Sequence, residues 1–228
     1  MRTLLAISLF ANFLGVAAAV YIVEGRGGFA YIESYLSHAP KAIDQAAAAR
    51  NQMLESLPIP ETPPVVFLGD SITAGCEWHE LLNSPGVLNR GIGGDTSAGV
   101  LARIPGILRL RPAKIFLMIG ANDAQALGYS PGMEFKEQRK IVMSLLANPA
   151  VRIYVQSILP SRNARFSRWG SEANRLLKTL QSSRVEFIDL RPAFEDHDGL
   201  IRPELTSDGL HLSAQGYRLW AAAIRGFI

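Results

Sequence analysis

From residue 63 onward, short apolar runs alternate with longer segments of mixed polarity. This alternation is typical of parallel strands that are joined by crossover helices. The run Ile115–Ile119 is continuously apolar, as expected for a strand that is buried on both faces. Five strands are predicted, at 65–68, 87–89, 114–119, 151–156 and 185–189.

Helix signals lie between and around these runs. Four helices are predicted, at 40–57, 96–109, 131–147 and 214–225. Pro105 is expected to break or kink the second of these helices. Ser130 before Pro131 and Ser213 before Ala214 are typical of residues that cap a helix start. The pattern therefore predicts one α/β domain over 63–228.

The amino-terminal segment has a different pattern. Residues 4–23 form an almost unbroken apolar run, which is long enough to cross a bilayer core of about 30 Å as a helix. The alternative is a cleaved signal peptide, because Ala17–Ala19 offer a processing site of small residues. We favour an uncleaved anchor over 1–23, since the run continues past that site to Val23. Residues 24–62 are then a juxtamembrane linker and helix, and the domain is extracytoplasmic, or periplasmic or secreted if cleavage occurs.

Composition agrees with one domain and excludes some classes of partner. The 228 residues are 48% hydrophobic, enough for one well-packed core. The net charge of +3 is spread along the chain, so nucleic-acid binding is not indicated. Cys76 is the only cysteine, which excludes an intramolecular disulfide and a cysteine cluster for metal. We expect neither a metal nor a cofactor.

Chemically versatile residues follow the predicted strands. Ligands of an open parallel sheet bind at the carboxyl ends of its strands, where the residues after each strand meet. Ser71 follows the first strand, Gly94 the second and Asn122 the third, while Asp208 and His211 lie beyond the fifth. We therefore expect these residues to converge on one rim of the sheet.

These residue types fit the cleavage of an ester through an acyl-enzyme. Ser71 is the predicted nucleophile, His211 the general base, and Asp208 the group that orients the imidazole. The oxyanion hole is predicted from the backbone amides of Ser71 and Gly94 and the side-chain amide of Asn122. Asp70 and Asp123 are predicted to be structural, accepting backbone hydrogen bonds in the turns that carry Ser71 and Asn122.

A second serine and an arginine-rich stretch need separate interpretation. Ser130 lies in a Gly-x-Ser-x-Gly pattern, but no strand precedes it, so a helix cap is the better interpretation.

The arginine-rich stretch with Arg165, Arg168 and Trp169 follows the fourth strand. It is either a solvated loop or a substrate-binding lip for an anionic or sugar-bearing ester.

Four blocks in this order resemble the SGNH or GDSL hydrolase family. They are Gly69-Asp70-Ser71, Asn89 to Asp95, Gly120 to Asp123, and Asp208 to His211. The sequence of the second block resembles that found in one branch of the family, which contains platelet-activating-factor acetylhydrolase subunits and bacterial acetylesterases. Ile72 replaces the leucine that gives the family its name, and Ala121 replaces a frequent threonine.

The resemblance implies a three-layer α/β/α sandwich of flavodoxin-like topology and a serine esterase that needs no cofactor. It also implies a short acyl group, such as an O-acetyl ester of carbohydrate or lipid. Two alternatives remain: acyl transfer to a sugar hydroxyl, and a catalytically idle binding module that is tethered to the membrane.

Overall fold

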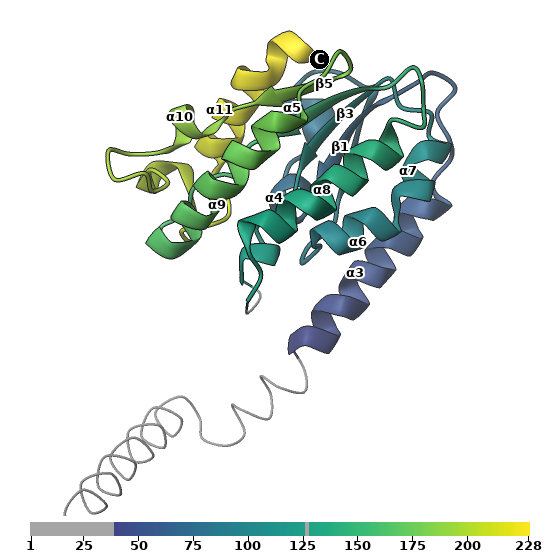
Figure 1. Cartoon of the computed structure of the whole chain (residues 1–228). Helices are drawn as coiled ribbons and strands as arrows, with labels where there is room; N and C mark the ends of the chain where they lie inside the picture. The colour runs from purple at the N-terminus through teal and green to yellow at the C-terminus, as the bar shows by residue number, and fades with distance from the viewer. Residues whose placement is uncertain (1–38, 126–127) are drawn as a thin grey trace, which may run out of the picture. The chain divides into compact units, whose positions relative to one another are not determined.

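The computed structural model of the chain describes residues 39–125 and 128–228 (Figure 1). Five parallel strands form one sheet in the order β2-β1-β3-β4-β5. The strands are β1 (Val65–Gly69), β2 (Val87–Gly91), β3 (Lys114–Met118), β4 (Arg152–Gln156) and β5 (Val185–Ile188). All five predicted strands are confirmed, and their ends differ from the predicted ends by at most two residues.

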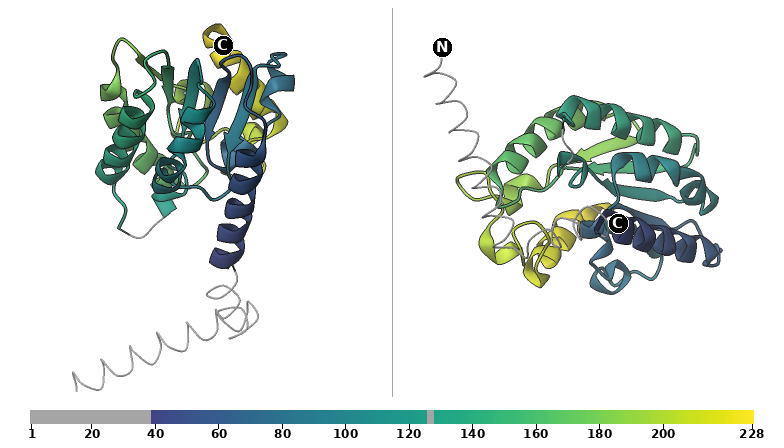
Figure 2. Two further views of the ribbon diagram at one scale, coloured as in Figure 1. Left: turned by 90° about the vertical axis from the view of Figure 1, so that its right-hand side faces the viewer. Right: turned by 90° about the horizontal axis from the view of Figure 1, so that it is seen from below.

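Helices lie on both faces of this sheet (Figure 2). The α-helices are α3 (Ala39–Ser56), α4 (Ser71–Ala74), α5 (Trp78–Leu81), α6 (Ser97–Ala102), α7 (Ile104–Arg109), α8 (Pro131–Leu145), α9 (Ala164–Leu177), α10 (Arg191–Phe194) and α11 (Ala214–Ile224). Short 3-10 turns occur at η1 (Asp123–Gln125), η2 (Lys178–Leu180), η3 (Pro203–Leu205) and η4 (Arg225–Phe227).

Fully buried aromatic side chains join the sheet to the helices on one face. Phe67 of β1 stacks on Trp78 of α5 at 4.3 Å between ring centroids and on Phe116 of β3 at 4.9 Å. Trp220 of α11 packs edge-on against Trp78 at 4.6 Å. All four side chains are excluded from solvent, so this stack fixes α5 and α11 against the centre of the sheet.

The predicted helix signals are confirmed. Thr96, Ser130 and Ser213 each accept a hydrogen bond from the backbone N–H three residues later, at the starts of α6, α8 and α11. The break expected near Pro105 occurs at Arg103, where α6 ends and α7 begins. Pro105 lies in the first turn of α7, where its missing N–H costs nothing.

The interpretation of the arginine-rich stretch as a solvated loop is wrong. Its residues from 164 onward belong to α9, which Asn163 caps by accepting the N–H groups of Arg165 and Phe166. The buried residues of α9 include Phe166, Ala173 and Leu177, which recur at helical spacing. The long polar side chains between them conceal this period in the sequence.

The predicted helix over 40–57 is confirmed as α3 to within one residue at each end. In the part of the chain that the structure describes, no helix is both long enough and apolar enough to cross a membrane. The apolar helix predicted over 4–23 and the linker that follows it, up to residue 38, lie outside the described residues.

Candidate active site

Ser71 is the first residue of α4 and follows β1 by two residues. Asp70 caps α4, and its Oδ1 accepts the N–H of Ile72 at 2.9 Å. Burial raises the pKa of Asp70 to about 7. Asp70 thus accepts a backbone hydrogen bond in the turn that carries Ser71, as predicted from the sequence.

The other end of α4 is held by Asn89 of β2. Its Nδ2 donates to the carbonyl oxygens of Thr73, Ala74 and Cys76 at 3.1, 3.1 and 2.8 Å. Its Oδ1 accepts the N–H of Gly91 at 2.8 Å. Sequence reasoning missed this role, although an amide side chain in an otherwise β-prone run was a signal for a buried polar contact.

A hydrogen-bonded chain links Ser71 to residues near the carboxyl terminus. Its Oγ lies 2.9 Å from Nε2 of His211, across a sequence separation of 140 residues. Nδ1 of His211 lies 2.7 Å from Oδ2 of Asp208. The structure therefore brings together the three residues that were predicted to form the catalytic triad.

The backbone of the Asp208 loop fixes this geometry. Oδ1 of Asp208 accepts the N–H groups of Leu210 and His211 at 2.9 and 2.8 Å. The hydroxyl of Thr206 donates to the carbonyl of His211 at 2.7 Å and accepts the N–H of Gly209. Four local hydrogen bonds thus hold the backbone of the loop that carries the imidazole.

These contacts also set the charge of Asp208. The hydrogen bond from His211, followed by the two backbone N–H groups, lowers the pKa of Asp208 to about 2. The carboxylate is ionised at neutral pH and can only accept hydrogen bonds. Nδ1 of His211 must therefore be the donor, so it carries the ring hydrogen. The lone pair of Nε2 then faces the hydroxyl of Ser71, as a general base requires.

Arg162 fastens the same loop to the segment that follows β4. Its backbone N–H donates to the carbonyl of Gly209 at 2.7 Å. Its guanidinium donates to Oδ2 of Asp196 at 2.9 Å and to the carbonyl of Ile201 at 3.1 Å. Arg162 is thus a support for the Asp208 loop, a role that sequence analysis did not find.

The predicted oxyanion donors lie on neighbouring turns. Gly94 has a φ of +78°, a conformation that only glycine adopts freely, and without a side chain its backbone can be approached closely. Nδ2 of Asn122 donates to the carbonyl of Asp95 at 2.8 Å, so one of its two hydrogens remains for a ligand. Among the described residues, the backbone N–H groups of Ser71 and Gly94 have no acceptor.

A buried ion pair supports the Gly94 turn. Oδ2 of Asp95 accepts Nε of Arg103 at 2.8 Å, and Nη2 of Arg103 donates to the carbonyl of Gly69 at 3.1 Å. Both charged side chains are at most 10% exposed. The pair connects the turn after β2 to the end of β1, which carries the predicted nucleophile.

Asp123 is structural, but its partner differs from the expected one. Its two carboxylate oxygens accept the backbone N–H and the hydroxyl of Ser97 at 2.9 and 2.8 Å. Ser97 belongs to α6, not to the turn that carries Asn122. The turn is therefore held by a helix 26 residues away in sequence, and burial raises the pKa of Asp123.

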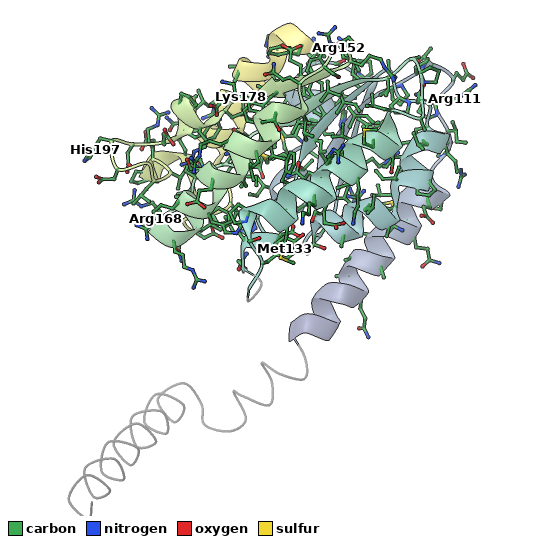
Figure 3. The ribbon with its side chains drawn as sticks, viewed as in Figure 1. Arg111, Met133, Arg152, Arg168, Lys178 and His197 are labelled. Atoms are coloured by element: carbon green, nitrogen blue, oxygen red, sulfur yellow. The ribbon has the colours of Figure 1, made fainter. Side chains whose placement is uncertain are left out.

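A cleft of about 730 Å³ opens beside the Asp208 loop. Its walls come from residues 124–125 and 128–130, from 161–163, 165, 166 and 169, and from 208–210. Arg165 and Trp169 line it, and the indole N–H of Trp169 donates to the carbonyl of Tyr129 at 3.0 Å. Arg168, labelled in Figure 3, is exposed and does not line the cleft. Of the three residues predicted to bind substrate, two thus share a cavity.

Comparison with known proteins defines the family. The model of the GDSL-like lipase/acylhydrolase family matches residues 67–219. The chain belongs to this family. This is a family of lipases and acylhydrolases, so the chain is an ester hydrolase, and the resemblance seen in the sequence is confirmed.

Among relatives in the GDSL-like family, the chain is similar to platelet-activating factor acetylhydrolase IB subunit alpha1 of Rattus norvegicus. The two are 31% identical over 165 residues, which cover 68% of this chain and 70% of the relative. A solved structure from Streptococcus pneumonia that is named for platelet activating factor has 25% identity and a TM-score of 0.77, and covers 85% of this chain and 97% of that one.

The fold is also shared with an acetylxylan esterase from Geobacillus stearothermophilus. The TM-score is 0.60 at 21% identity, and the match covers 74% of this chain and 94% of that one. The expected five-stranded parallel α/β fold is therefore found in the structure, and both of these solved structures share the overall fold.

Proposed function

We propose that this protein hydrolyses short acyl esters, of the O-acetyl type, on carbohydrate or lipid through a Ser-His-Asp acyl-enzyme mechanism. The observation that carries the proposal is the continuous chain from Asp208 through His211 to Ser71, with contacts of 2.7 and 2.9 Å. An ionised carboxylate, an imidazole with its free lone pair directed at a hydroxyl, and unpaired donors nearby are the parts that acyl transfer needs.

In the first half of the reaction, Oγ of Ser71 attacks the ester carbonyl and His211 takes the hydroxyl proton. Asp208 stabilises the resulting imidazolium. The oxyanion accepts hydrogen bonds from the N–H groups of Ser71 and Gly94 and from the amide of Asn122. The tetrahedral intermediate then collapses: the bond to the alcohol oxygen breaks, His211 returns the proton to that oxygen, and an acyl-serine remains.

The second half repeats the first with water as the attacking group. His211 accepts a proton from water, the hydroxyl oxygen bonds to the acyl carbon, and the bond to Ser71 breaks. The proton passes from His211 to the serine oxygen, so the free enzyme and a carboxylic acid are restored. Each proton moves through the same Nε2 atom of His211, which lies 2.9 Å from Oγ of Ser71.

The short acyl group is supported by relatives. The mammalian relatives are named acetylhydrolases, and a protein of the same fold is named an acetylxylan esterase. Removal of an acetyl group is the step that these names share. The alcohol to which the acetyl group is attached differs between them, so it has to be argued from the cavity of this chain.

The decisive test is the hydrolysis of p-nitrophenyl acetate, butyrate and octanoate by the full chain. We expect the highest kcat/KM for acetate, and a loss of at least about 1,000-fold in Ser71→Ala. Ser182→Ala is the matched control, because Ser182 is an exposed serine before β5. Equal rates for the wild type and Ser71→Ala would overturn the mechanism, and a preference for octanoate would overturn the short acyl group.

For location, we propose that residues 1–23 anchor the protein and that 24–62 space the catalytic domain from an extracytoplasmic membrane surface. The apolar run of residues 4–23 supports this proposal. Full-length protein should remain in the membrane pellet after alkaline carbonate extraction. Its complete release into the supernatant would contradict the anchor.

A further inference from the structure

The cleft beside the Asp208 loop is far larger than an acetyl group. Its volume of about 730 Å³ lies within the range of sites that hold whole small-molecule ligands. Asp208, Gly209 and Leu210 form part of its wall, so the cleft adjoins the catalytic triad. If the acyl group is short, as the proposed function requires, the part of the ester that fills this cleft is the alcohol.

The walls of the cleft offer both aromatic faces and hydrogen-bonding groups. Phe166 and Trp169 supply aromatic rings, and Trp169 is fixed by its hydrogen bond to the carbonyl of Tyr129. Gln125, Ser130 and Asn163 add amide and hydroxyl groups. The side-chain oxygens of Ser130 and Asn163 cap α8 and α9, so the hydroxyl hydrogen of Ser130 and the Nδ2 group of Asn163 remain available to a ligand. An alkyl chain cannot accept hydrogen bonds from these donors, whereas a sugar provides a ring face for stacking and hydroxyls for hydrogen bonds.

The charges in the cleft are not balanced. Two positively charged residues and one negatively charged residue line it: Arg162, Arg165 and Asp208. Arg162 pairs with Asp196 at 2.9 Å, and Asp208 pairs with His211 at 2.7 Å. Arg165 has no carboxylate within 4.0 Å among the side chains that the structure describes, those of residues 45–125 and 128–228.

We propose that the cleft binds the alcohol part of the ester, and that this part is an acidic sugar whose carboxylate pairs with Arg165. The proposal rests on the proposed function and assigns its substrate class. Guanidinium groups suit carboxylates because two parallel N–H groups can meet two oxygens. Arg165 is exposed, so the gain from this pair is modest and decreases as salt is added.

The test compares two esters that differ only in charge. The probes are the mono-O-acetylated methyl glucoside and the corresponding methyl glucuronoside, in which a carboxylate replaces the hydroxymethyl group. We expect the wild-type full chain to prefer the uronate about 2- to 5-fold in kcat/KM at low salt. In Arg165→Gln that ratio should fall to about 1, because the amide keeps polarity and loses charge.

Arg168→Gln is the matched control, since Arg168 lies on the same helix and outside the cleft. Its ratio should equal that of the wild type. A wild-type ratio near 1, or an equal fall of the ratio in both variants, would overturn the proposal. Raising the salt concentration should lower the wild-type ratio, and a ratio that is insensitive to salt would also count against pairing with Arg165.

Failure of this proposal can be told apart from failure of the proposed function. If the chain hydrolyses p-nitrophenyl acetate but does not discriminate between the two sugar esters, only the acidic-sugar assignment fails. If no ester is hydrolysed, the proposed function fails, and binding of the two sugars to Ser71→Ala, measured by calorimetry, decides the present proposal. Tighter binding of the uronate supports it, and equal binding overturns it.

Discussion

At the scale of single residues, Asp208 has two separate tasks. One carboxylate oxygen holds the backbone of its own loop, and the other holds the imidazole of His211. A group with only one of these contacts would either leave the loop unsupported or leave the imidazole free to rotate. The low pKa of Asp208, about 2, follows from both sets of donors.

Asp208→Asn separates the two tasks. The amide oxygen can still accept the N–H groups of Leu210 and His211, so the loop should fold. The amide nitrogen cannot accept the Nδ1 hydrogen, which favours the imidazole tautomer with its proton on Nε2, facing Ser71. We expect kcat for p-nitrophenyl acetate to fall about 1,000- to 10,000-fold, as in a known serine protease, with a melting temperature within a few degrees of the wild type.

A second aspartate-histidine pair provides the control. Oδ2 of Asp198 lies 3.3 Å from Nε2 of its neighbour His197, and both side chains are well exposed. Asp198→Asn should keep the wild-type kcat. If Asp208→Asn lost less than about 10-fold in kcat, or if the loss were explained by unfolding, the assignment of Asp208 as the orienting group would be wrong.

At the scale of elements, α4 is too short to be stable by itself. It has four residues, whereas isolated helices need roughly a dozen to be even marginally stable. Asp70 caps its start, Asn89 holds its final carbonyls, and the hydroxyl of Tyr217 donates to the carbonyl of Ile72 at 2.9 Å. The position of Ser71 therefore depends on β2 and α11 as much as on its own helix.

Asn89→Ala should reveal this dependence. The variant removes one donor from each of three carbonyl oxygens and the side-chain acceptor from the N–H of Gly91. The carbonyls of Thr73 and Cys76 keep the indole and backbone N–H groups of Trp78 as donors, so the main loss falls on Ala74 and Gly91. Each buried group that loses its partner costs about 1–3 kcal/mol, although water can reach some of them. We expect the free energy of unfolding to fall by about 2 kcal/mol in urea denaturation, and kcat to fall about 10-fold.

Asn51→Ala is the comparison for this variant. Asn51 lies on α3 and donates one exposed hydrogen bond, to Glu55 at 3.1 Å. Its loss should change the free energy of unfolding by less than about 0.5 kcal/mol. If Asn89→Ala lowered the free energy of unfolding no more than Asn51→Ala, the hydrogen bonds from Asn89 to the end of α4 would contribute nothing to stability.

The sequence predicts those elements whose signals are local. Caps such as Ser130 and Ser213 act on N–H groups three residues away, and strand runs are contiguous. Asn89 and Asp123 could not be assigned in the same way, because their partners lie 16 and 26 residues away and meet them only after the sheet forms. The helix α9 was missed because arginines interrupt the spacing of its buried residues.

At the scale of the whole molecule, buried acids lie behind the predicted oxyanion turn. Glu134 of α8 is fully buried, and its Oε1 accepts Nε2 of Gln138 at 2.7 Å. Burial, reinforced by the charge of Asp123, raises the pKa of Glu134 to about 8. Burial also raises the pKa values of Asp70 and Asp123. All three acids bind protons more tightly in the folded state than in the unfolded state.

The sign of the effect on stability follows from linkage. A carboxyl group whose pKa is higher in the folded state imposes no penalty below its unfolded pKa of about 4. The penalty grows as the pH rises towards the folded pKa, here about 8. Glu134→Gln removes one buried ionisation, so it should raise the free energy of unfolding at pH 8 by at least about 1 kcal/mol relative to its effect at pH 5.

Chemical denaturation at both pH values measures this difference. Glu172→Gln is the control, because Glu172 lies on the exposed side of α9, and it should change stability equally at pH 5 and pH 8. If Glu134→Gln changed the free energy of unfolding by the same amount at pH 8 and at pH 5, Glu134 would have to be ionised in the folded protein.

The convergence of the site could be predicted at this scale because the sheet is parallel. Residues that follow different strands must meet at one edge, so Ser71, Asn122 and Asp208 could be grouped before their distances were known. The pairing of Arg162 with Asp196, and therefore the unbalanced charge of Arg165, could not be predicted. That pairing depends on how two loops pack, and neither loop has a periodic pattern.

The 140-residue separation between Ser71 and His211 also affects how the protein becomes active during synthesis. Long-range contacts form slowly, and the amino-terminal part of a chain leaves the ribosome first. In the proposed mechanism, Ser71 therefore emerges well before its base, His211, and before α11, which a hydrogen bond from Trp220 to Gln156 ties to β4. The appearance of esterase activity would then report that the last part of the chain has docked.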